Sequence, residues 1–307
     1  MTLSDTKEFL SQTGKVTMGV AGLLLHCAEG EKLPRMMDLA RTLKSGHGTI
    51  QDAFSYLVKS GAITVEARGA QGSYLIAADY TRLWRYAGNE WIVGSMPLPY
   101  TLRYEGLATA LYAQLEMSKL PFNMTYQRGS LSRGDMVRKG HYHFAVMSML
   151  AAEHFVKQHP DVMIVAQLPG ESYVSEHVLV SRVPREHVHY IGVDFTSLDE
   201  KPLTEDESSL HSSWETVPIT RAQVLDLLQE EQFDAVIWNQ DGVQTAPENV
   251  VLLPLLGDAQ KRKLASQTAI IALKDGPVCN VLKGIFSPGT ITTVQKEVLE
   301  RHRQPRY

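Results

Sequence analysis

KLPRMMDLARTLKSGHGTIQDAFSYLVKSGAITVEARGAQGSYLIAA, residues 32–78, contains two short helical patterns followed by two short strand patterns. In the first helical pattern, Leu33, Leu39 and Leu43 recur at the spacing of one helix face. The second pattern repeats this spacing with Ile50, Ala53, Phe54, Leu57 and Val58. Two amphipathic helices are therefore predicted, each with one apolar face.

Glycines mark the breaks between these patterns. Gly46 and Gly48 lie between the two helical patterns, where close glycines make one continuous helix costly in conformational entropy. Gly61 follows the second pattern as a C-cap, and the strand patterns at 62–67 and 73–77 flank a glycine-rich turn. This order of elements is typical of a helix-turn-helix with a β wing, whose second helix lies in the major groove of DNA.

The stretch resembles the winged helix-turn-helix of GntR-type bacterial transcriptional regulators, which implies that it binds DNA. The resemblance depends on Leu33–Pro34, Asp38–Ala40, Gly48–Ile50, Ala53, Leu57, Ser60–Gly61 and Arg68–Ile76. The chain departs from the family pattern at Met37, His47 and Gln51, where GntR-type heads usually carry arginines. Those side chains are expected to meet bases or phosphates, so we expect a different operator sequence.

Six residues of this region are predicted to contact a double-stranded DNA operator. Gln51 is expected to read an adenine edge in the major groove, and Thr49 is expected to contact phosphate. The other candidate backbone contacts are Arg35, Lys44, His47 and Arg68. A solvent-exposed helix carries the same residue types without any function. A head that lacks three basic residues is also compatible with binding a protein instead of DNA.

Composition and charge limit the kinds of partner. The chain has 307 residues, of which 44% are hydrophobic and 21% charged, as expected for a globular protein of about two domains. Its formal net charge of -4 argues against coating nucleic acid through bulk electrostatics. Residues 1–80 contain eight Lys and Arg and eight Asp and Glu, so the head is neutral. We therefore predict a homodimer, because two heads double the phosphate contacts.

The sequence predicts a cytoplasmic protein. Cys27 and Cys279 each have apolar neighbours, as expected for reduced structural thiols. The start, MTLSDTKEFL, lacks the basic and apolar regions of a signal peptide, and a short helix is expected at residues 4–12. No run reaches the ~20 apolar residues of a membrane helix, so no membrane contact is expected.

From Trp91 onward the pattern changes to alternating strands and helices. Strands are predicted at 91–94, 122–127, 141–147, 162–168, 173–181, 189–193, 214–219, 233–238, 250–255 and 268–273. Helices are predicted between them, including 148–158, one starting at 220–223 and a last one at 291–302. Short connections favour a mostly parallel sheet covered by helices, an α/β fold. We predict a DNA-binding domain at 1–79, a linker at 80–90 and a ligand-binding domain at 91–307.

Residues 91–307 resemble the type 2 periplasmic-binding-protein fold, a two-lobed receptor that cytoplasmic regulators use as an effector domain. The resemblance depends on the polar turn after the first strand, Arg128-Gly129-Ser130 before a helix, residues 136–145, and a crossover at 168–182. The whole chain is similar to the YhfZ family of proposed regulators, which joins a winged head to such a receptor. This similarity implies an effector domain behind a DNA-binding head.

In a two-lobed receptor the ligand lies between the lobes, near helix N-termini and loops at strand ends. Such loops contain the predicted ligand-binding residues Ser95, Tyr100, Thr101, Arg128, Ser130, Ser148, Asn239 and Asp241. Arg128 is suited to a carboxylate or phosphate, so a small anionic metabolite is expected. Helix capping or surface solvation is the competing explanation for each single residue. Glu171, Ser172 and Tyr173 are expected at the crossover, as hinge, cleft wall or simple turn.

No enzymatic motif stands out. His141 with His143 and His187 with His189 place imidazoles in pairs on one strand face, but neither pair has a nearby Cys or a further helical His at metal spacing. We therefore predict no metal site and no cofactor. The sequence lacks a phosphate-binding glycine loop and a Gly-x-Ser-x-Gly nucleophile turn. A non-enzymatic, ligand-responsive transcriptional regulator is predicted; the alternative is an enzyme on this scaffold, with the N-terminal part serving in dimerisation or protein binding.

Overall fold

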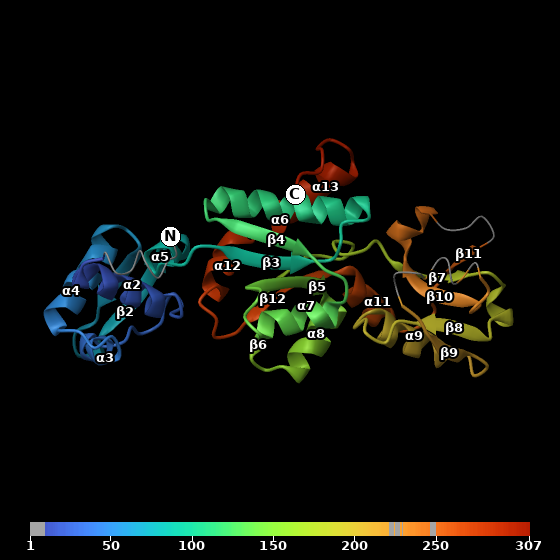
Figure 1. Cartoon of the computed structure of the whole chain (residues 1–307), viewed down its shortest axis with the longest axis horizontal. Helices are drawn as coiled ribbons and strands as arrows, with labels where there is room; N and C mark the ends of the chain where they lie inside the picture. The colour runs from blue at the N-terminus through green and yellow to red at the C-terminus, as the bar shows by residue number, and fades with distance from the viewer. Residues whose placement is uncertain (1–9, 221–223, 225–227, 229, 246–249) are drawn as a thin grey trace. The chain divides into compact units, whose positions relative to one another are not determined.

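The computed structural model describes residues 10–220, 224, 228, 230–245 and 250–307. The helix expected at 4–12 and the helix start expected at 220–223 lie largely outside these residues. The chain divides into two compact units that exchange segments of sequence (Figure 1). The first unit comprises residues 1–92, 118–121 and 275–285, and the second comprises residues 93–117, 122–274 and 286–307.

Helices make up most of the first unit, and local sequence determines where they begin and end. Ser11 caps the first of them, because its Oγ accepts a hydrogen bond from the Gly14 amide at 3.1 Å. Gly61, with a φ of 71°, follows the third as the expected C-cap glycine. The helices are α2 (Gln12–Leu24), α3 (Met36–Thr42), α4 (His47–Lys59) and α5 (Tyr80–Tyr86). The two helices predicted for the helix-turn-helix, α3 and α4, are thereby confirmed.

A two-stranded ribbon follows α4. Its strands, β1 (Ile63–Ala67) and β2 (Ser73–Ala78), run antiparallel. The turn between them contains a 3-10 segment, η1 (Gly69–Gln71), and a hydrogen bond from Arg68 N to Gly72 O at 2.8 Å. Gly72 has a φ of 93°, which other residues rarely adopt. The β wing therefore lies where the sequence predicted it.

The core of the first unit lies between the helices and the wing. Val20 of α2, Leu39 of α3, Ile50 and Leu57 of α4, and Leu75 of β2 are each at most 2% exposed. Full burial of one such side chain contributes about 1.5–3 kcal/mol. α4 turns Ile50, Ala53, Phe54 and Leu57 of its predicted apolar face inward, whereas Val58 is exposed together with the polar face.

A short helix from the C-terminal part of the chain completes the first unit. α12 (Cys279–Ile285) contacts α5 and buries Leu282 completely. Asn280 Nδ2 donates to the carbonyl oxygens of Leu25 at 3.0 Å and Cys27 at 3.3 Å, which follow the end of α2. Carbonyls at a helix C-terminus lack intrahelical partners, so this side chain satisfies acceptors that the helix leaves open. The sequence pattern did not reveal α12.

The second unit contains two five-stranded sheets in its described part (Figure 1). The first has the order β4-β3-β5-β12-β6, with β3 (Ile92–Met96), β4 (Phe122–Tyr126), β5 (Phe144–Ser148), β6 (Val162–Gln167) and β12 (Thr268–Leu273). The second has the order β11-β7-β10-β8-β9, with β7 (His177–Ser181), β8 (Tyr190–Val193), β9 (Glu215–Pro218), β10 (Ala235–Asn239) and β11 (Val251–Pro254). Each sheet forms the centre of one lobe.

Both sheets are mixed, which corrects the prediction of a mostly parallel sheet. β3 pairs in parallel with β5, whereas β12 is antiparallel to both β5 and β6. In the other lobe β8 is parallel to β9 and β10, whereas β7 is antiparallel to β10 and β11. Strand direction depends on which distant segments become neighbours, and a local pattern of apolar residues does not contain that information.

Helices pack against the sheets of both lobes. They are α6 (Leu102–Ser118), α7 (Ser130–Arg138), α8 (Met149–Gln158), α9 (Glu200–Ser208), α11 (Ala259–Ser266) and α13 (Pro288–Leu299), with 3-10 segments η2 (Arg185–His187) and η4 (Gln240–Thr245). Phe155 and Ile271 belong to the core of the first lobe, and Trp214 and Ile237 to that of the second. Among the described helices, none combines the length and apolarity needed to span a bilayer.

The chain crosses between the lobes twice. It leaves the first sheet after β6 and enters the second at β7, so residues 168–176 form the first crossing. It returns after β11 and re-enters the first sheet as β12, which lies between β5 and β6. The first crossing lies within the crossover that the sequence predicted at 168–182.

Leu282→Ala is expected to lower the free energy of unfolding by about 2–5 kcal/mol, because removing a fully buried leucine side chain leaves a cavity beside α5. Lys283 is exposed on the same helix, so Lys283→Ala should change stability by less than about 0.5 kcal/mol. Urea unfolding of the full-length protein, followed by circular dichroism, measures both. Equal stabilities would show that α12 does not belong to the core of the first unit.

Candidate functional site

The polar face of α4 is the candidate DNA-binding surface. His47 and Gln51 are exposed and Thr49 is half-buried, whereas Ile50 and Leu57 on the other face are buried. His47 and Gln51 are four residues apart, so their side chains lie one above the other on one face of the helix. The structure therefore brings the predicted groove contacts together.

The three other predicted DNA contacts lie outside α4. Arg35 is exposed directly before α3, and Lys44 is exposed in the turn before α4. Arg68 is at the turn of the wing, where it pairs with Glu66 at 2.6 Å and lies 4.4 Å from the centre of the Tyr74 ring. An exposed ion pair of this kind is worth at most about 1 kcal/mol, so a phosphate can compete with Glu66 for Arg68.

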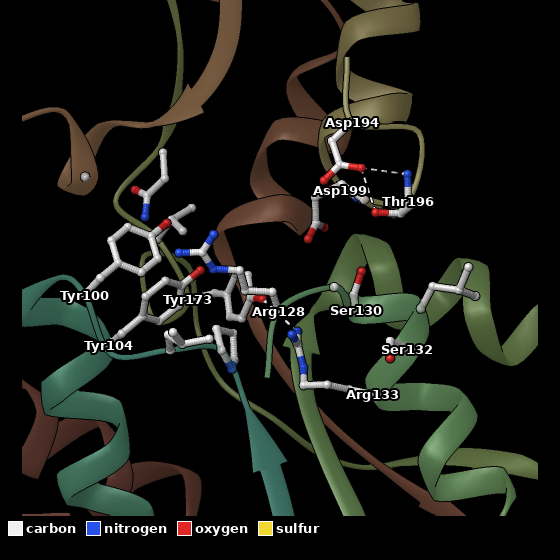
Figure 2. A pocket seen from close by; sticks show the side chains of 18 of the residues that line it. Tyr100, Tyr104, Arg128, Ser130, Ser132, Arg133, Tyr173, Asp194, Thr196 and Asp199 are labelled. Atoms are coloured by element: carbon white, nitrogen blue, oxygen red, sulfur yellow. Dashed lines mark hydrogen bonds between the residues drawn. The ribbon is translucent and has the colours of Figure 1, made fainter. Parts of the chain in front are cut away.

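A cavity of about 760 Å³ lies in the second unit (Figure 2). Four of the predicted ligand residues line it: Tyr100, Arg128 and Ser130 from the first lobe, and Asn239 from the end of β10 in the second. The volume falls within the range of about 300–1,000 Å³ that is typical of small-molecule sites. Because both lobes contribute to the wall, contacts to a bound molecule depend on how the lobes are arranged.

Two of the remaining predicted residues cap helices and are not part of the cavity wall. Thr101 Oγ1 accepts a hydrogen bond from the Tyr104 amide at 3.2 Å, at the start of α6. Ser148 Oγ accepts one from the Ala151 amide at 3.0 Å and is the N-cap of α8. Helix capping, the alternative considered for these hydroxyls, is what they do in this structure.

The last two predicted residues also lie outside the wall. Ser95 is fully buried in β3. Asp241 forms an ion pair with Arg103 of α6 at 3.0 Å, and the two side chains are 18% and 13% exposed. The Asp241 carboxylate therefore already has a cationic partner within the protein.

Arg133 is a buried cation in the cavity wall that the sequence pattern did not reveal. It is 2% exposed, and its guanidinium donates to Val146 O at 3.1 Å, Gln127 O at 2.8 Å and the Tyr173 hydroxyl at 3.4 Å. These acceptors are neutral, and no carboxylate of a described residue lies within 4.0 Å of the guanidinium. A buried charge without an opposite charge is costly, so this site favours an anion.

The start of α7 adds to this positive potential. Gly129 precedes the helix with a φ of 80°, and no side chain caps the first turn. Unpaired amide N–H groups and the helix dipole both favour an anion at such a position. Arg128 is exposed at the wall and makes no hydrogen bond or ion pair with the residues that the structure describes. It is therefore available to a ligand.

Hydrogen bonds join the two lobes at one edge of the cavity. Ser148 Oγ donates to the carboxylate of Asp199, and the Leu198 amide donates to Ser130 Oγ at 3.3 Å. Ser130 and Ser148 begin helices of the first lobe, whereas Leu198 and Asp199 follow β8 in the second. Asp199 thus places a carboxylate of the chain itself at the N-terminus of α8, where negative charge is favoured.

A second contact between the lobes lies beside the crossing segment. Arg103, which pairs with Asp241, also donates to the carbonyl oxygen of Glu171. Asp241 accepts a hydrogen bond from the Ser175 amide at 2.7 Å. Glu171 and Ser175 both belong to residues 168–176, so the ion pair connects each lobe to the segment that joins them.

Three tyrosines form the aromatic part of the wall (Figure 2). The ring centres of Tyr100 and Tyr104 are 5.6 Å apart, those of Tyr104 and Tyr173 are 5.3 Å apart, and both pairs meet edge to face. Tyr104 and Tyr173 are buried, whereas Tyr100 is 48% exposed. Tyr173 was considered as part of a hinge, a cleft wall or a simple turn, and in the structure it lines the cavity wall.

Asn239 offers a hydrogen-bond donor from the second lobe. The residue is 1% exposed, and its Oδ1 accepts from the Asp241 amide at 2.9 Å. Its Nδ2 has no hydrogen-bond partner among the described residues. A buried donor without a partner costs about 1–3 kcal/mol, so a ligand acceptor placed here would be favoured.

Residues considered for metal or redox chemistry have structural roles. His143 Nδ1 accepts from the Val93 amide at 2.9 Å, and burial lowers the pKa of His143, which keeps the ring neutral. Burial also raises the pKa of the Cys27 and Cys279 thiols, which keeps them protonated. Within the described ranges, no cluster of three or more His, Cys, Asp or Glu side chains is suited to a metal ion.

The sequence-based prediction did not include two kinds of residue that line the cavity wall. Arg133 and Tyr104 lie inside helices, whereas the prediction considered only loops and helix starts. Asp199 lies directly before α9, and the sequence-based prediction did not include it among the ligand residues. One signal was available for Arg133, because it follows Ser130 by three residues and thus places a cation in the first turns of a helix. The helix dipole disfavours a cation there unless an anion is also present.

These features define a class of protein. A helix-turn-helix head indicates DNA binding, and the same chain contains a two-lobed α/β domain with one sheet in each lobe. Residues 79–307 match the family described as the YhfZ C-terminal domain, and residues 28–75 match a helix-turn-helix domain. The chain belongs to the YhfZ family.

Relatives of known sequence or structure agree with this assignment. The chain is 31% identical to the uncharacterized protein YhfZ of Escherichia coli (strain K12), over 98% of this chain and 99% of the relative. The crystal structure of YhfZ from Shigella flexneri matches 75% of this chain and 98% of that chain, with 29% identity and a TM-score of 0.64. The periplasmic aliphatic sulphonate binding protein SsuA of Escherichia coli matches 69% of this chain and 75% of that chain, with 11% identity and a TM-score of 0.50. The similarity to SsuA shows the two-lobed fold alone.

Arg133→Met is expected to remove the stabilisation of the protein by citrate and inorganic phosphate, because it deletes the buried cation of the cavity. In the unsubstituted protein an anion at 100 times its dissociation constant should raise the free energy of unfolding by about 2.7 kcal/mol. Thermal unfolding with and without each anion measures the effect. Arg138→Met is the control, because Arg138 is on the same helix but pairs with Asp161 at the surface. The same anion response in both variants would exclude Arg133 from the anion site.

Proposed function

We propose that this chain is a ligand-responsive bacterial transcriptional regulator that acts as a cytoplasmic homodimer. Residues 1–79 bind an operator as a GntR-like winged head, residues 80–90 link, and residues 91–307 sense a small anionic metabolite. The main observation is that one chain joins an outward-facing second helix of a helix-turn-helix to a cavity that contains Arg133. Within the described residues, that arginine has no carboxylate partner.

The polar face of α4 supports DNA binding. The second helix of this motif enters the major groove, and the exposed residues His47 and Gln51 lie one turn apart on it. A glutamine amide matches the donor and acceptor of an adenine edge. Since the head is electrically neutral, phosphate contacts of a single head are few, and two symmetric heads on a palindromic operator double them.

The position of the cavity supports ligand sensing. Arg133 and the start of α7 belong to the first lobe, whereas Asn239, with its Nδ2 donor, belongs to the second. An anion that contacts both sets binds one arrangement of the lobes better than another. Such a difference in affinity is required of any ligand that switches a protein between two states.

The contacts of two cavity serines give no support to a serine nucleophile at these positions. Ser130 Oγ accepts from the Leu198 amide, and Ser132 Oγ accepts from the Gln127 side chain at 2.6 Å. A serine nucleophile needs an adjacent base to take its proton. The hydrogen bonds of these two serines do not supply one.

Replacing Thr49 and Gln51 together by alanine is expected to weaken specific binding to DNA that flanks the protein's own gene by about tenfold or more. The reason is that the lost base contact of Gln51 costs about 1–3 kcal/mol, and the lost phosphate contact of Thr49 weakens binding further. Gel shift and fluorescence anisotropy at low salt measure the affinity of the full-length protein, and circular dichroism verifies the fold.

The matched control is Gln12→Ala with Thr13→Ala, which removes the same two residue types from exposed positions in the first turn of α2. This control should bind the DNA as the unsubstituted protein does. If both double variants lose the shift equally, α4 is not the reading helix. If the unsubstituted protein binds the DNA no better than random sequence, the regulator proposal is wrong.

A further inference from the structure

We infer that the cavity takes an aromatic acid, a molecule with one carboxylate or phosphate at the start of α7 and a flat ring against Tyr100. The inference depends on the proposed function, because it names the ligand class of the same cavity. It follows from a difference between two parts of the wall, one cationic and one aromatic.

Of the two helix starts at α7 and α8, both within the described residues, α7 is the one open to an anionic group. At α8, Ser148 caps the helix and Asp199 already supplies a carboxylate. At α7 no side chain caps the first turn, and Arg133 and the exposed Arg128 line the cavity beside it. Helix N-termini with nearby arginines bind carboxylates and phosphates through charge-assisted hydrogen bonds. The ligand therefore presents its acid group to α7.

The rest of the cavity needs a larger, apolar body. A volume of about 760 Å³ greatly exceeds that of a lone carboxylate or phosphate group. Besides its charged and polar residues, the wall has an apolar part that includes Pro97, Leu98, Val174 and Trp238 as well as the three tyrosines. This apolar part binds a hydrophobic or aromatic group better than a second charged one.

Tyr100 is both exposed and fixed in place, which suits it to hold a ring. Its amide donates to Leu98 O at 2.9 Å, and the Tyr104 ring lies edge to face with it at 5.6 Å. Gly242 lies close beside it, since a Cβ at that position would approach Tyr100 Cε2 to 3.0 Å. A ring held by such contacts, yet 48% exposed, loses little conformational freedom when a ligand stacks on it.

The cationic and aromatic parts of the wall are continuous. Arg133 Nη2 lies 3.4 Å from the Tyr173 hydroxyl, the Tyr173 ring contacts that of Tyr104, and the Tyr104 ring contacts that of Tyr100. Figure 2 shows the three tyrosines on one side and Ser130, Ser132 and Arg133 on the other. One small molecule can therefore contact the cationic and the aromatic part together.

Isothermal titration of the full-length protein with phenylacetate and cyclohexylacetate tests the inference, since the two acids have the same charge and carbon number and differ in the flatness of the ring. We expect phenylacetate to bind about fivefold more tightly, because an aromatic pair gains more than its buried area supplies. Tyr100→Ala should abolish this preference, and Tyr100→Phe should retain it. Tyr190→Ala is the control, since Tyr190 is also 48% exposed but lies outside the cavity wall.

Arg128→Gln and inorganic phosphate separate this inference from the proposed function. Arg128→Gln should weaken both acids and inorganic phosphate alike, because it removes the charge that all three share as a partner. Equal affinity of the two acids, or a preference that survives Tyr100→Ala, would overturn the aromatic ligand class. If phosphate binding remained sensitive to Arg128→Gln in that case, anion sensing would stand. Failure of both acids and phosphate to bind would contradict anion sensing and the aromatic class together.

Discussion

The cavity of the second unit depends on a buried cation, the guanidinium of Arg133. It connects α7 to the carbonyl of Val146 in β5, to the carbonyl of Gln127 after β4, and to Tyr173 in the segment between the lobes. Removing a guanidinium from water costs several kcal/mol, and neutral acceptors offset only part of that cost. The residue that orders three separate segments around the cavity therefore also determines the sign of the charge that the cavity favours.

Polar contacts connect the lobes at the edge of the cavity and beside the crossing segment. Asp199 of the second lobe bonds to Ser148 of the first, and Arg103 of the first lobe pairs with Asp241 of the second. Each contact joins groups from different lobes, so each depends on the arrangement that a ligand would select. What remains for a ligand is the positive region at the start of α7, together with the Nδ2 of Asn239 from the opposite lobe.

Patterns within about twenty residues were enough to predict the helices α3 and α4, the wing and the strand at 268–273, because apolar periodicity and glycine positions are local properties. Strand directions were not predictable in this way, since β12 lies between β5 and β6 only after the chain has built the other lobe.

The predicted ligand residues also differed in whether the local sequence was enough to identify them. Loops at strand ends correctly pointed to the region of the cavity, but a hydroxyl that caps a helix, such as Thr101, has the same sequence context as one that faces a ligand. Arg133 could not be identified as a cavity residue from the sequence, because its role depends on burial, which a single sequence does not reveal.

Each of the two units is built from several separate stretches of the chain, and this determines which residues form the core around the helix-turn-helix. The chain passes from one unit to the other at residues 92, 117, 121, 274 and 285, so the units are joined by several covalent connections instead of a single tether. Strand β12 ends at Leu273, in the first sheet of the second unit, where it lies between β5 and β6. Helix α12 begins at Cys279, packs on α5 and donates hydrogen bonds to carbonyls at the end of α2. Since α2 in turn packs against α4, the reading helix rests on a core to which the C-terminal part of the chain contributes. The core of the first unit therefore includes residues 279–285 as well as the N-terminal helices.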